Sequence, residues 1–175
     1  MKRRMLIILM SFICLPMCCY AAIHNEIKPL LFLHHINVIK ASERDGDEVY
    51  FDVSVYRSNH AEQYFRIPEK PFHWVSQLVG KLSQVKLWSE PIKEGETVVI
   101  IVSLIETDAS FIEPDDLIGV MRIKLKNEHG VLQARWTMPN HLEGPVTVPT
   151  DHNDIQKFDL RGEGSDYEVF LSIEK

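Results

Sequence analysis

The feature that most constrains the fold of this chain is a two-residue alternation of apolar and polar side chains. The segments "VYFDVSVY" (49–56), "VMRIKLK" (120–126) and "YEVFLSIEK" (167–175) place apolar residues at every second position. In an extended strand these residues point to one face, so the pattern predicts half-buried β-strands. The segment "TVVIIVSLI" (97–105) is apolar at nearly every position, which predicts a strand in the middle of a sheet.

Turn sequences rich in Gly, Asp, Asn and Ser separate these runs, at 44–48, 93–96, 127–130 and 161–166. Between them we expect eight strands, at 30–40, 48–57, 62–67, 84–90, 96–106, 117–126, 131–137 and 166–174. Their regular spacing predicts an all-β fold, an eight-stranded antiparallel β-sandwich; an α+β fold is the alternative. One short helix is expected within 72–82, and 138–154, which contains three prolines, is expected to be a long loop.

The first 21 residues have the pattern of a secretory signal peptide. Basic residues at 2–4 precede an apolar run at 5–17, and small residues follow up to Ala21. We expect cleavage after Ala21, which leaves 22–175 as a single domain that is periplasmic or secreted. The alternatives are a retained anchor, for which the run is short, and a lipoprotein linked through Cys18, for which Met17 is a large preceding residue.

Cysteine content limits the disulfides that the mature domain can form, and net charge limits the classes of partner that it can bind. Cys14, Cys18 and Cys19 are the only cysteines and all lie in the expected signal peptide, so the mature domain would form no internal disulfide. Without the signal peptide the chain has 16 basic and 25 acidic residues, a net charge of −9. This acidity argues against nucleic acid, which requires clustered Lys and Arg. It also argues against docking on an anionic lipid surface unless a divalent cation intervenes.

Two acidic loops are the candidate binding site. The segment "IETDASFIEPDDLIG" (105–119) contains five carboxylates and no Lys or Arg, and "SERDGDE" (42–48) contains four carboxylates and one Arg. Loops of a sandwich gather at its two ends, so the carboxylates converge if both loops leave the same end. Ca²⁺ takes six to eight oxygen ligands of this kind. The expected ligands are Asp45, Asp47, Asp108 and Asp116, followed by Glu106 and Asp115.

The alternative is that these acidic residues occupy ordinary solvated turns, in which Asp is common. Phe111 and Ile112 form an apolar tip between the carboxylates. That tip either inserts into a membrane or partner, or folds back onto the sandwich.

The same residues resemble C2 domains. "DDLIG" followed by "VMRIKLK" and preceded by "IETD" resembles the third loop of that family, and "DGDEVYFDVSVY" is similar to its first loop. The resemblance implies a compact β-sandwich whose loops bind Ca²⁺ and lipid head groups. Two departures are visible: Glu106 and Asp108 stand where the family has Asp-x-Asp, and Gly46 to Tyr50 replace its Ser-Asp-Pro-Tyr.

Catalytic motifs are not found in the sequence. Its eight histidines include no His-x-x-x-His pair, and it has no Gly-x-Ser-x-Gly elbow and no P-loop. The sequence therefore predicts an exported, non-enzymatic binding module of C2-like type that engages a membrane or protein partner through its acidic loops with Ca²⁺. One alternative is a metal-free structural or interaction domain of the bacterial envelope that uses an exposed sheet edge or surface patch. Another is a hydrolase with dispersed catalytic residues.

Overall fold

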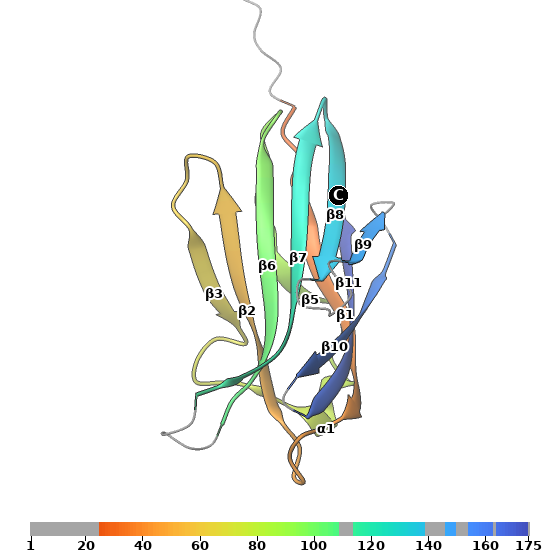
Figure 1. Ribbon diagram of the computed structural model, residues 1–175. Helices are drawn as coiled ribbons and strands as arrows, with labels where there is room; N and C mark the ends of the chain where they lie inside the picture. The colour runs from red at the N-terminus through yellow and green to blue at the C-terminus, as the bar shows by residue number, and fades with distance from the viewer. Residues whose placement is uncertain (1–24, 109–113, 139–145, 150–153, 163, 175) are drawn as a thin grey trace, which may run out of the picture.

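The chain folds into two antiparallel β-sheets that pack face to face (Figure 1). The computed structural model describes residues 25–108, 114–138, 154–162 and 164–174, and the backbone of 146–149. The expected all-β sandwich is confirmed, and the α+β alternative is wrong. No helix among the described residues has the length and apolar character needed to cross a bilayer. The expected signal peptide lies outside the described residues.

The two sheets differ in size, and all their pairings are antiparallel. The larger sheet contains, in spatial order, β3 (Gln63–Ile67), β2 (Glu48–Arg57), β6 (Thr97–Glu106), β7 (Asp116–Glu128), β8 (Val131–Met138) and β9 (Val146–Pro149), and β4 (Trp74–Val75) also pairs with β2. The smaller sheet contains β10 (Gln156–Gly162), β11 (Ser165–Glu174), β1 (Leu30–Lys40) and β5 (Val85–Trp88). The strands β3 and β5 therefore lie at sheet edges.

The alternating residues predicted to share a face form the core. In β2, Val49, Phe51, Val53 and Val55 are fully buried, and the corresponding residues of β7 and β11 are buried with them. The central position of β6 is confirmed, because it pairs with β2 on one side and β7 on the other. Its second apolar face is only half-buried, since the outer face of the larger sheet has no third layer of described residues on it.

The sequence patterns missed three strands. The two-residue β4 is too short to show a period, and β9 lies inside the segment expected to be a loop. The strand β10 does alternate, with Phe158 and Leu160 buried, but it has only two apolar residues. The helix expected within 72–82 is a single turn, α1 (Ser76–Val79). The four-residue spacing of Trp74, Leu78 and Leu82 suggested that they share one apolar helix face, which is wrong, because Leu78 is exposed and Trp74 lies in β4.

Two glycines allow β10 of one sheet to cross β7 of the other at close range. A Cβ atom on Gly162 would lie 2.4 Å from the Leu117 carbonyl oxygen and 2.7 Å from that of Ile118. A Cβ atom on Gly119 would lie 2.9 Å from the Leu160 side chain. The sheets therefore meet here at a separation that only glycine permits, next to the end of the molecule that holds the acidic loops.

Replacing Gly162 with alanine is expected to lower the free energy of unfolding by about 1–3 kcal/mol, because the new methyl group meets rigid backbone carbonyls. Chemical denaturation measures the loss. The matched control is Gly80→Ala, where the nearest atom to the added Cβ is 3.8 Å away and we expect little change. Equal effects of the two substitutions would contradict the close crossing of β7 and β10.

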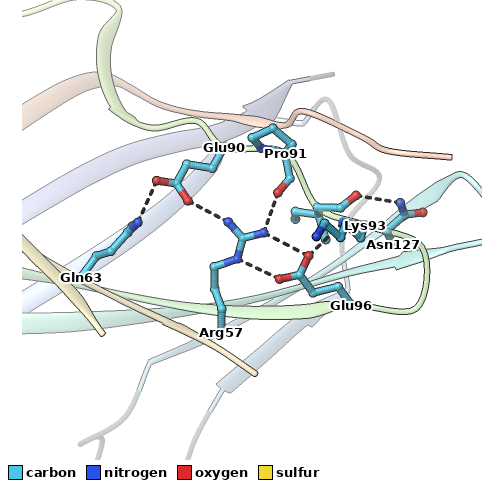
Figure 2. Close-up of polar contacts among 8 residues, drawn as sticks. Arg57, Gln63, Glu90, Pro91, Lys93, Glu96 and Asn127 are labelled. Atoms are coloured by element: carbon cyan, nitrogen blue, oxygen red, sulfur yellow. Dashed lines mark hydrogen bonds and ion pairs between the residues drawn. The ribbon is translucent and has the colours of Figure 1, made fainter. Parts of the chain in front are cut away.

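A partly buried ionic network joins the end of β2 to the connection between β5 and β6 (Figure 2). The Arg57 guanidinium donates to both carboxylate oxygens of Glu96, at 2.8 and 3.0 Å, and to Glu90 at 2.7 Å. It also donates to the Pro91 carbonyl oxygen, while the Gln63 side chain donates to the other oxygen of Glu90. The network thereby fixes the edge strand of the smaller sheet relative to the edge strand of the larger one.

Candidate functional site

The two acidic loops lie at the same end of the sandwich. The strand β2 begins beside the point where β6 ends, since Val49 pairs with Glu106 and the Thr107 amide donates to the Glu48 carbonyl oxygen at 2.7 Å. In the next pair of strands, Glu106 is opposite Asp116. We call this end of the molecule, with the described residues of 42–48, 106–108 and 114–116, the acidic pole.

The Asp47 side chain is buried, and both of its carboxylate oxygens accept hydrogen bonds. It is 0% exposed. One carboxylate oxygen accepts from the amides of Ser42 and Glu43 and from the Ser42 hydroxyl, at 2.9–3.1 Å. The other oxygen accepts from the hydroxyls of Ser165 and Tyr167, at 2.8 and 2.5 Å. Burial raises the pKa of Asp47, but the hydrogen bonds, that from Tyr167 first, outweigh burial and leave the pKa below its ordinary value.

Glu106 is a second buried carboxyl group next to Asp47. It is 3% exposed, and its two oxygens lie 2.9 and 3.0 Å from the Ser42 hydroxyl, which also lies 3.1 Å from Asp47. Burial is the main reason why the pKa of Glu106 rises to about 7, and the negative charges of Asp47 and Glu43 add to the increase against the lowering effect of the Ser42 hydrogen bond. Below about pH 7 the pair of carboxyl groups therefore carries one proton, which is bound to Glu106.

Replacing Glu106 with glutamine is expected to remove a pH dependence of stability between the unfolded pKa of 4.5 and the folded pKa of about 7. Because the pKa of Glu106 is raised on folding, its contribution is full below the unfolded pKa and is lost as pH rises through about 7. The glutamine variant should exceed the wild type by about 1–3 kcal/mol at pH 8. Urea titrations at several pH values test this, with the exposed Glu174→Gln as control. Parallel pH profiles for wild type and Glu106→Gln would contradict it.

The other expected metal ligands have separate surroundings. The Tyr50 hydroxyl donates to Asp115 at 2.6 Å, and the backbone carbonyl of Asp45 accepts from the Gln77 side chain. Asp108 and Asp116 are half-buried. The described residues contain no group of three or more His, Cys, Asp or Glu side chains arranged to hold a metal ion. Phe111 and Ile112 lie outside the described residues.

A second candidate site is an open cleft between the edge strands β3 and β5. Its volume is about 460 Å³, within the range of ligand sites in proteins. It is lined by Phe65, Arg66, Ile67, Glu69, Lys86, Leu87, Trp88, Ser89 and Glu90. The floor is apolar, because Leu87 and Trp88 are buried and Phe65 and Ile67 pack against the core. Glu90, held by Arg57 and Gln63, is part of the lining.

Aromatic side chains stand on the outer face of β3 beside this cleft. Tyr64 is 65% exposed and donates to Asp52, and Phe72, which follows β3, is 68% exposed. The Arg66 guanidinium lies 3.5 Å from the centre of the Tyr50 ring and donates to the Phe72 carbonyl oxygen. Tyr and Arg are enriched at protein interfaces. We call the free edge of β3, with Tyr64, Arg66 and Phe72, the β3 edge.

No direct signal for the β3 edge or the cleft is present in the sequence. The segment "QYFRI" reads as a strand, but its position at a sheet edge depends on the order of strands. One weak signal was present, since the strand exposes an aromatic residue and contains no Lys or Pro of the kind that protects edges.

Neither a protein-family model nor a curated protein matches this chain. The proposed function therefore rests on the fold and on the geometry of the two candidate sites.

Proposed function

We propose that this chain is an exported, non-enzymatic binding module that holds a segment of a partner protein along the β3 edge. The observation that carries the proposal is that β3 is a regular edge strand with the exposed side chain of Tyr64 on one face and a cleft on the other. Its pairing with β2 runs from Ile67 to Gln63 without a bulge. An unprotected edge of this kind is a template for strand pairing.

The chemistry of binding would be strand addition. An extended segment beside β3 gains hydrogen bonds from the unpaired backbone groups of the edge, and its alternate side chains face opposite sides of the sheet. Those on the outer side would meet Tyr64 and Arg66, and those on the inner side would meet the cleft. Export is proposed from the basic and apolar pattern of residues 2–17, and membership of the C2-like type from the loop resemblance alone.

Peptide selection tests this function. A random library of short peptides displayed on yeast is selected against the protein, and hydrogen exchange then locates the bound peptides. We expect slower exchange of the amides at 63–67. Tyr64→Lys should weaken binding by about tenfold, because edge lysines oppose strand pairing, whereas Val131→Lys, at an exposed position on β8, should not. Failure to select any peptide, or protection confined to other segments, would refute the proposal.

Calcium binding at the acidic pole is the second candidate, favoured by the meeting of both acidic loops at one end. In that case Ca²⁺ would bridge the pole to a phospholipid membrane or protein. We expect no increase in melting temperature with millimolar Ca²⁺, because Asp47 and Glu106 are already held by internal hydrogen bonds. An increase that Asp108→Ala and Asp116→Ala abolish would instead favour the calcium site, since a ligand of the native state raises its stability.

A further inference from the structure

The cleft behind β3 has features that specify which side chains an added strand would carry. Its floor combines side chains from both sheets: Phe65 and Ile67 from β3 and Leu87 and Trp88 from β5. This is the open side of the sandwich, where the edge of each sheet ends without a neighbouring strand among the described residues. An apolar side chain placed here would contact two sheets at once.

Trp88 is the largest side chain of this apolar floor. It lines the cleft and is 4% exposed.

The charges at the rim are of two kinds. Glu90 shares the single positive charge of Arg57 with Glu96, so these three side chains together keep one negative charge. Lys86 is exposed and makes no ion pair with any described residue. Glu69, after β3, is exposed on the opposite wall. The β5 wall of the cleft therefore presents a cation that an acidic side chain would complement.

We infer that the segment bound at the β3 edge is an extended peptide with a large apolar side chain in the cleft and an acidic side chain next to Lys86. This inference rests on the proposed function and specifies the partner. Burial of one large apolar side chain corresponds to an affinity gain of about 10-fold to 100-fold. The rim charge has a smaller effect, about threefold, because it remains in contact with water.

The selected peptides provide the probes. In each of them the apolar residue is replaced by alanine and the acidic residue by lysine, and binding to the protein is measured by titration calorimetry. We expect the alanine peptides to bind about 10-fold to 100-fold more weakly and the lysine peptides to bind about threefold more weakly. Two variants of the protein test the cleft without altering β3: Ser89→Phe fills it, and Lys86→Glu reverses its rim charge. Lys86→Glu should weaken the binding of peptides that carry the acidic residue and restore the binding of peptides in which lysine replaces it.

The outcomes of these binding experiments distinguish failure of the cleft inference from failure of the proposed strand addition. Peptides that protect 63–67 but bind equally well to Ser89→Phe and Lys86→Glu would overturn the cleft inference and leave strand addition in place. Peptides that do not protect 63–67 would overturn both. If Ser89→Phe lowers the melting temperature, the Lys86→Glu charge reversal still decides the matter. The exposed Lys157→Glu, on β10, is the matched charge control and should leave the affinity of every peptide unchanged.

Discussion

Replacing Asp47 with alanine is expected to lower the free energy of unfolding by about 3–5 kcal/mol. Asp47 accepts hydrogen bonds from five donors, and its removal leaves the Ser165 and Tyr167 hydroxyls and two backbone amides without their acceptor. Each buried donor left unpaired costs about 1–3 kcal/mol, although local rearrangement recovers part of the sum. Denaturation with urea, monitored by tryptophan fluorescence, gives the value.

The control for this substitution is Asp45→Ala in the same loop, where the carboxylate is exposed and we expect a change within about 0.5 kcal/mol. The Asp47 variant should also bring the pKa of Glu106 closer to its ordinary value, because one of the charges that raises it is gone. A loss of stability no larger than that of Asp45→Ala would show that the network does not stabilise the acidic pole.

Replacing Arg57 with methionine is expected to lower the free energy of unfolding by about 2–4 kcal/mol, because it leaves the partly buried carboxylate of Glu96 without its partner. The side chains of Arg57 and Glu96 are only 10% and 11% exposed. The Arg57 hydrogen bond is the main reason that the pKa of Glu96 lies below its ordinary value. Chemical denaturation at pH 7 measures the loss. The ion pair of Arg161 with Asp166 provides a matched control, because Arg161 is 70% exposed and Arg161→Met should cost less than about 1 kcal/mol.

The double variant Arg57→Met with Glu96→Met distinguishes loss of an ion pair from loss of packing. Removing both partners leaves only the charge of Glu90 without a partner, and that side chain is 33% exposed, so stability should recover in part. A double variant that is less stable than the sum of the two single changes would rule out the ionic explanation.

The strands with several alternating apolar residues were predictable from sequence, because side-chain period and burial are set locally. All eight expected strands exist, and the faces marked by Val49, Met121 and Tyr167 are the buried ones. Tyr50 shows where the local rule fails: it belongs to the polar face of β2 but is buried under Arg66 and bonded to Asp115. Those partners come from β3 and from the loop before β7, and the sequence does not reveal which strands are neighbours.

The candidate sites were also predictable from the sequence only in part. The acidic character of both loops is plain in the sequence, but the burial of Asp47 depends on Ser165 and Tyr167, more than one hundred positions away. Those long-range hydroxyls make Asp47 part of the protein interior, whereas its sequence neighbours suggest a surface ligand. The cleft depends on β3 and β5 being edges of different sheets, which is a property of topology and cannot be derived from the period of either strand.

The pairing of β1 has a consequence for the order in which the protein assembles. This strand, among the first in the chain, lies between β5 and the last strand, β11. Its longest pairing, from Leu30 to Lys40, is with residues 166–174. The smaller sheet therefore cannot close until the carboxyl-terminal residues have been synthesised, and contacts of such high sequence separation slow folding. Until then β1, the first long strand among the described residues, has an incomplete set of neighbours.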